Sequence, residues 1–188
     1  MAEANLDRLK TNFQKLLARG RQYFFGQQKQ SIQWYKNKSN EVNSSDSILK
    51  QNRDLTSKTI QGGTGNMFLF NYVPKHKNTL PVYDLYPLCI PFKYVPEGFY
   101  GVNLHYLDYK TRAIFFDQLT TILTNKRWDE TTRMAISYDW IKSVSRVPAI
   151  KNTIKHYLYP YVRSRFMYIP PLEWETALFL PLQQFVYK

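Results

Sequence analysis

Cysteine, histidine and acidic residues are all scarce in this 188-residue sequence, and each shortage excludes a class of protein or site. A single cysteine, Cys89, cannot form an internal disulfide, and it is interpreted as a buried thiol because it lies in an apolar run. With only three histidines, none at helical ligand spacing from another, the sequence has no zinc-binding pattern. No apolar run approaches the roughly 18 residues that a membrane-spanning helix needs. We therefore expect no cofactor, no metal site and no membrane partner.

Residue patterns typical of active sites are also missing. The GGTGN segment at residues 62–66 lacks the Lys-Ser/Thr ending of a phosphate-binding loop and precedes a predicted strand, so it is interpreted as a linker. Acidic residues are scattered, and their two closest groupings, at 129–130 and 173–175, fall in predicted helices instead of facing each other across a cleft. We predict that the protein is not an enzyme and has no small-molecule substrate.

Basic and aromatic residues, by contrast, are abundant. Lysine and arginine number 26 against 14 acidic residues, which gives a formal net charge of +12, and 16% of the residues are aromatic, including 15 tyrosines. A basic excess of this size favours an anionic partner such as nucleic acid or an acidic protein surface. Aromatic side chains offer large contact areas both in cores and at interfaces. The composition therefore favours a protein that binds partners.

Residues 1–66 differ from the rest of the chain, with 11 basic residues, five acidic residues and no proline. Apolar residues at helical spacing predict an amphipathic helix over residues 6–19. From residue 27 to residue 57 apolar residues are too sparse to close a core, so we expect a basic arm that becomes ordered on a partner. The predicted partner-binding residues of this arm are Arg19, Arg21, Tyr23, Phe24, Phe25, Trp34, Tyr35 and Lys36.

Residues 67–188 are predicted to form an α+β body, a small mixed domain of short strands with three to four helices. Apolar and aromatic runs predict strands over 67–72, 88–94, 99–105 and 165–169, and four prolines exclude a helix through residues 80–107. Helical spacing predicts helices over 112–123, 129–144 and 148–158, and a short helix begins at Pro171.

One stretch of the body, residues 142–165, combines six basic residues with tyrosines and contains no acidic residue. Cations that neutralise phosphate beside rings that stack on bases are typical of nucleic-acid contacts. A contact with an acidic protein surface is equally consistent with the pattern, and so is a solvated helix face. The candidates for such a contact are Lys142, Arg146, Lys151, Lys155, Tyr157, Tyr159, Arg163 and Arg165.

Several blocks of unusual sequence carry a resemblance to a known family. They are SIQWYKNK at residues 31–38, LPVYDLYPLCIPF at 80–92, GFYGVNLHYL at 98–107 with the following Arg112, RSRF at 163–166 and EWETALFLP at 173–181. In these blocks the chain resembles small virion-associated proteins of contractile-tailed phages of the T-even type, especially their marine relatives. The resemblance implies a protein of the phage particle or of its assembly, and it transfers no catalytic residue. The family tends to have proline after HYL, where this chain has Asp108-Tyr109, so the local turn is expected to differ.

Three hypotheses follow, of which the first is favoured. In the favoured hypothesis, the chain is a structural component of the phage tail, baseplate or neck. It is then located in the virion, assembled in the host cytoplasm, and packed on other virion proteins in a ring. Alternatively, it contacts DNA as a packaging or DNA-end-protecting factor. A nuclease-like enzyme is the third and least favoured hypothesis.

Overall fold

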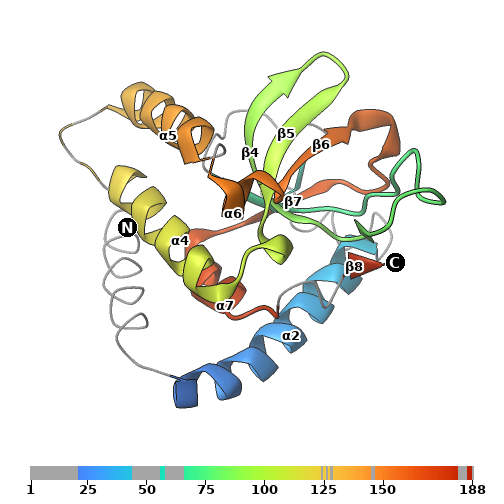
Figure 1. Cartoon of the computed structure of the whole chain (residues 1–188), viewed down its shortest axis with the longest axis horizontal. Coiled ribbons are helices and arrows are strands. Elements are labelled where there is room, and N and C mark those ends of the chain that lie inside the picture. Colours follow the sequence, from blue (N-terminus) through green and yellow to red (C-terminus); the bar gives the residue numbers. More distant parts are fainter. Residues whose placement is uncertain are drawn as a thin grey trace.

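The computed structural model describes residues 21–43, 56–57, 66–123, 125, 127, 129–144, 147–181 and 186–187. Within them the chain folds as an α+β domain in which helices pack on an antiparallel sheet, and this confirms the predicted fold class (Figure 1). The helix predicted over residues 6–19 lies outside the described residues. No described helix is long and apolar enough to span a membrane.

In the described part of the chain, six strands form the main sheet in the order β1-β7-β2-β4-β5-β6, and every neighbouring pair is antiparallel. A second, two-stranded sheet pairs β3 with β8, so the chain segment before β4 lies against the C-terminal segment. Along the chain the strands are β1 (Thr56–Ser57), β2 (Met67–Leu69), β3 (Tyr83–Asp84), β4 (Leu88–Val95), β5 (Gly98–Asn103), β6 (Ile154–Leu158), β7 (Phe166–Ile169) and β8 (Val186–Tyr187).

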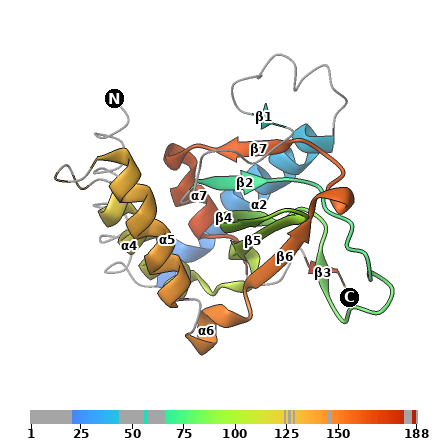
Figure 2. The same cartoon turned by 90° about the horizontal axis from the view of Figure 1, so that it is seen from above.

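The α-helices gather along one face of the main sheet. In Figure 2, α4 and α5 lie at the opposite end of the molecule from β3 and β8. The α-helices are α2 (Arg21–Asn43), α4 (Tyr109–Leu123), α5 (Glu130–Val144), α6 (Pro148–Lys151) and α7 (Trp174–Leu178), and the short 3-10 helices are η2 (Leu104–Tyr106), η3 (Tyr159–Tyr161) and η4 (Pro171–Glu173).

Between these helices and the sheet lies the larger core, which contains Leu88 and Ile90 from β4, Phe116 from α4 and Trp174 from α7, all fully buried. Phe116 and Trp174 place their ring centroids 5.6 Å apart, so α4 and α7 meet through aromatic contact. Burying side chains of this size removes much apolar area from water, which is the main force that holds the helices on the sheet.

On the other face, the sheet curls around a second core made largely of aromatic rings. Phe70 lies at its centre, with ring centroids 5.0 Å from Phe166 and 5.2 Å from Tyr157. The curl is closed by a bridge between Tyr72 and Val162, which links the chain after β2 to the chain after β6. Edge-to-face packing of these rings favours a fixed arrangement of the strands that carry them.

The hairpin of β4 and β5 contains a bulge between Pro91 and Lys93, where the register shifts by one residue. Proline has no backbone N–H for the ladder, so a bulge is one of the few places in a sheet that accept it. The shift buries Phe92 in the helix-side core and pairs Lys93 with Tyr100. A side chain on Gly101, opposite Pro91, would collide with the sulfur of Cys89, so glycine is required at this close approach.

The predicted helix over residues 148–158 is wrong beyond its first turn. The chain forms α6 only to Lys151, and the following residues are the edge strand β6. The Thr153 hydroxyl donates to the Ile150 carbonyl and its own carbonyl accepts from Asn103 N, so the chain leaves the helix to join the sheet. The predicted strands at 88–94, 99–105 and 165–169 and the helices at 112–123 and 129–144 are confirmed with small changes of boundary.

Asp108 explains why α4 begins earlier than expected. Its carboxylate accepts hydrogen bonds from Lys110 N at 3.0 Å and from Thr111 N and Oγ1 at 3.1 and 2.6 Å. Desolvation raises the pKa of Asp108, but the bonds from Thr111 and Lys110 outweigh it, so the pKa lies below its ordinary value. Asp108 is thus an acidic N-cap of α4.

Asp108→Ala is expected to lower the free energy of unfolding by about 1 kcal/mol at neutral pH, because an N-cap acceptor is lost. The pKa of Asp108 is lower in the folded chain, so its stabilisation is full above the unfolded pKa and is lost as the pH falls through the folded pKa. Urea unfolding at several pH values checks this. The difference between wild type and variant should shrink in acid, and a difference independent of pH would contradict the cap.

Candidate nucleic-acid interface

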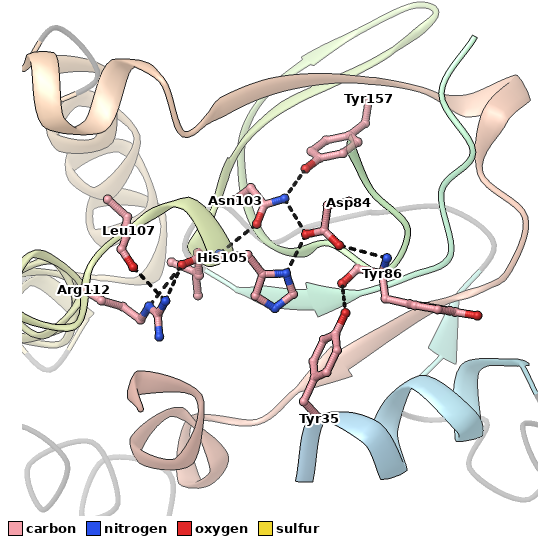
Figure 3. Close-up of polar contacts among 9 residues, drawn as sticks. Tyr35, Asp84, Tyr86, Asn103, His105, Leu107, Arg112 and Tyr157 are labelled. Carbon is pink, nitrogen blue, oxygen red and sulfur yellow. Dashed lines mark hydrogen bonds and ion pairs between the residues drawn. The ribbon is translucent and has the colours of Figure 1, made fainter. Parts of the chain in front are cut away.

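A buried polar network joins β3, β5, η2 and β6 (Figure 3). The Asp84 carboxylate contacts His105 Nδ1 at 2.5 Å and accepts from Asn103 Nδ2 at 2.9 Å. Asn103 Nδ2 also donates to the Tyr157 hydroxyl at 3.0 Å, and Asn103 Oδ1 accepts from His105 N at 2.9 Å. Burial raises the pKa of Tyr157, which keeps its hydroxyl neutral. The network therefore ties the edge strand β6 to β5, to η2 and to β3 of the two-stranded sheet.

Helix α2 is attached to the same network through Tyr35. Its hydroxyl donates to the Tyr86 carbonyl at 2.9 Å, and its ring meets the edge of the His105 ring with centroids 4.9 Å apart. The backbone N of Tyr86 in turn donates to Asp84 at 3.0 Å. These bonds fix the position of α2 relative to the sheet (Figure 3).

Arg112 forms a second buried polar centre on the helix side. Its fully buried guanidinium makes six hydrogen bonds of 2.7–3.1 Å to five carbonyl oxygens, which belong to Leu104, Leu107, Ala177, Leu178 and Leu180. Desolvation lowers the pKa of Arg112 to about 9, against the raising effect of Asp108, so the group remains charged at neutral pH. The cation lies at the C-terminal end of α7, where the helix dipole favours positive charge. Arg112 thus joins η2, α4 and the C-terminal segment.

Neither buried centre is open to a substrate. Asp84 is 5% exposed and Asn103, His105 and Arg112 are not exposed at all, so these groups contact only the protein. In the described part of the chain, no three His, Cys, Asp or Glu residues are grouped so that they could hold a metal ion. These residues therefore shape and hold the fold, and the sites for partners must be sought on its surface.

On the surface, a row of cationic and aromatic side chains crosses three neighbouring strands. The register pairs Lys93 of β4 with Tyr100 of β5, and Tyr100 with His156 of β6. The rings of Tyr100 and His156 are stacked, with centroids 4.4 Å apart and planes 7° apart. The Lys93 ammonium lies 5.5 Å from the centroid of the Tyr100 ring. Lys93 is exposed and both rings are half-buried, so solvent reaches the row.

Two more lysines, one on β6 and one on α5, are also placed over tyrosine rings. Lys155 lies 4.3 Å from the ring centroid of Tyr106, and burial lowers its pKa. Lys142, in the last turn of α5, lies 5.7 Å from the ring centroid of Tyr138. Neither Lys93 nor Lys155 forms an ion pair with an acidic side chain in the described residues. A partly desolvated lysine without a carboxylate gains most from an anion that binds beside it.

The contact residues predicted in the basic stretch 142–165 lie on several different elements of the structure. Lys142 and Lys151 are exposed on α5 and α6, and Lys155 is half-buried on β6. Tyr157 is 3% exposed, and its ring belongs to the aromatic core. The half-buried Tyr159 packs against the same core in η3. Beyond η3 follow the exposed Arg163 and the half-buried Arg165, while Arg146 lies outside the described residues.

Of the partner-binding residues predicted for the N-terminal arm, the structure describes the side chains of Trp34, Tyr35 and Lys36, all on α2. Trp34 Nε1 donates to the Glu173 carboxylate and Tyr35 is 3% exposed, so both rings contact the body of their own chain. Lys36 is exposed on α2. Arg21, Tyr23, Phe24 and Phe25 lie in the first two turns of α2 with side chains outside the description, and Arg19 lies outside the described residues. Residues 21–43 thus form a helix, and Trp34, Tyr35 and Val42 of this helix pack against the larger core.

Comparison with known proteins gives one match. A family model described as "Phage T4 terminal DNA protecting protein" matches residues 7–188, and neither the curated proteins nor the solved structures give a match. The description agrees with the predicted DNA-end-protecting alternative, so the favoured prediction of a tail, baseplate or neck component is wrong. It points to DNA as the partner and gives no support to a ring of virion proteins. Because the match covers nearly the whole chain, the protein belongs to the phage T4 terminal DNA protecting protein family.

Proposed function

We propose that this chain binds the ends of linear double-stranded DNA and shields them without chemical reaction, as a protein carried with the DNA in the phage particle. The observation that carries the proposal is the match of residues 7–188 to a family described by DNA-end protection. Shielding needs only a bound protein that denies other proteins access to the end. It does not require catalytic groups, and the buried polar centres of this chain serve the fold.

The electrostatics support the same partner. The formal net charge is +12, and no acidic residue occurs between Asp139 and Glu173. Within the described residues, this part of the chain carries the exposed Lys142 and Lys151 and the half-buried Lys155, and the exposed Lys93 lies on β4, two strands from β6. Lysines that neutralise phosphates release counterions from DNA, which makes the affinity depend on salt.

Equilibrium binding of the full chain to linear duplex DNA across a salt series tests the proposal. With about four lysines in contact with phosphates, the logarithm of the affinity should fall against the logarithm of the salt concentration with a slope of about −3.6. The same sequence closed into a circle is the matched control, because it has equal length and charge but no ends. Linear DNA should bind more tightly than the circle at every salt concentration.

Equal affinity for the linear and the circular DNA would contradict end binding and leave a general DNA-binding protein. Absence of binding to both at low salt would contradict the proposal as a whole.

A further inference from the structure

The row of Lys93, Tyr100 and His156 ends at an edge of the sheet. β6 is the last strand in the order β1-β7-β2-β4-β5-β6, so among the described residues no further strand of this sheet lies beyond His156. The ring of His156 is covered on one side by Tyr100, at 4.4 Å between centroids. Rings on neighbouring strands stack at roughly the interstrand spacing of about 4.8 Å. In the described part of the chain, the row of stacked rings that follows the strand order therefore ends at the half-buried His156, whose Nε2 is buried.

The two faces of this edge differ in chemistry. Consecutive residues of a strand point to opposite faces, so Lys155 and His156 flank the edge of β6 from two sides. Lys155 lies over the Tyr106 ring, and its partial burial keeps it poorly hydrated. An aromatic surface with a cation beside it fits a nucleotide, which has a flat base and an anionic phosphate.

An interior base pair of a duplex is covered on both faces by its neighbours, whereas the terminal base pair has one bare face. An aromatic side chain that is the last ring of a stack within the protein can cover that bare face, and the duplex does not need to unstack. Every base has a π-face, so such a contact does not depend on sequence.

We propose that the terminal base pair of a DNA end stacks on His156 and extends the Tyr100–His156 stack, while Lys93 and Lys155 neutralise the adjacent phosphates. This inference rests on the proposed function and adds the feature of the DNA that is recognised, which is the bare face of the last base pair. Recognition by stacking distinguishes an end from the interior of a duplex, which phosphate contacts alone do not.

The test uses the full chain and blunt duplexes that carry the fluorescent base 2-aminopurine at either the terminal or an interior position. Binding should change the fluorescence of the terminal base and leave that of the interior base unchanged. His156→Ala should abolish this change and weaken end binding by about fivefold or more, as expected for the loss of one stacked base. His156→Phe keeps a flat ring and should preserve both signals.

His76→Ala is the matched control, because His76 is exposed in a turn outside this row. It should behave as the wild type does, and thermal unfolding of each variant verifies that it is folded. End binding without a change in the terminal base, or a fully active His156→Ala, would overturn the stacking contact and leave the proposed function standing. Failure of the wild type to prefer ends over circular DNA would overturn both.

Discussion

Arg112→Met is expected to lower the free energy of unfolding by more than about 4 kcal/mol, because it leaves several buried carbonyl oxygens without their donor. Five carbonyl oxygens share this one guanidinium, and they come from η2, from Leu107 directly after it and from the C-terminal segment. A domain is typically stable by only about 5–15 kcal/mol, so this variant should be largely unfolded or close to it. Arg112→Lys should also be strongly destabilised, since an ammonium has three donors and cannot reproduce the planar fork.

Urea unfolding followed by tryptophan fluorescence measures this effect. Lys110→Met is the control, since Lys110 lies on the same helix but is exposed. It should change the free energy of unfolding by less than about 0.5 kcal/mol, which is usual for surface substitutions. If Arg112→Met unfolded within about 1 kcal/mol of the wild type, the carbonyls would have other donors and the role given to Arg112 would be wrong.

The second large effect concerns DNA affinity. The double variant Lys93→Gln with Lys155→Gln removes two cations, so the slope of log affinity against log salt should become less steep by about 1.8. Extrapolated from 1 M salt to physiological ionic strength, that slope corresponds to a loss of affinity of about 30-fold. Neither lysine forms an ion pair with an acidic side chain in the described residues, so the fold should be little affected.

Lys75→Gln with Lys77→Gln provides a control that removes the same charge. Both lysines are exposed in the turn before β3, away from the β4–β5 hairpin (Figure 1). If affinity depended only on net charge, the two double variants would lose equal affinity. That result would contradict a localised interface on β4, β5 and β6.

The fold can be predicted from the sequence where the spacing of apolar residues within a segment matches the period of a helix or a strand. The helices at 112–123 and 129–144 and the strands of the β4–β5 hairpin follow from apolar spacing, prolines and the Pro96-Glu97-Gly98 turn. Helix α2 was not predictable in this way, because its buried face consists of Ser31, Tyr35, Ser39 and Val42, of which only two are apolar. Small hydroxyl residues permit close packing against α7, but hydrophobic periodicity does not detect them.

The candidate interface was only partly predictable. The stretch without acidic residues predicts three lysines of the interface, namely Lys142, Lys151 and Lys155. It does not predict the cross-strand row of Lys93, Tyr100 and His156. The hairpin turn suggests that Lys93 and Tyr100 are close, but the bulge at Pro91 sets their register, and the partner strand β6 was predicted as a helix. A cross-strand row cannot be found while one of its strands is assigned to another structure.

The blocks that carry the family resemblance have a structural explanation. These blocks contain the residues that form the two buried polar centres, which are Tyr35, Asp84, Asn103, His105 and Arg112 (Figure 3). Buried polar groups must be paired with specific partners, which restricts the residues that can replace them. The residues that carry the resemblance are therefore ones that stabilise the fold, whereas the residues proposed to contact DNA lie on the surface.

Protection of DNA ends is measured most directly by digestion of one linear DNA with two kinds of nuclease in the presence of the full chain. At a protein concentration of about 100 times the Kd, mass action leaves about 1% of the ends free, so digestion by an exonuclease should slow by about two orders of magnitude. Cleavage by an endonuclease at a site far from the ends should proceed at the rate seen without protein. Equal inhibition of both nucleases, or inhibition of neither, would contradict the account.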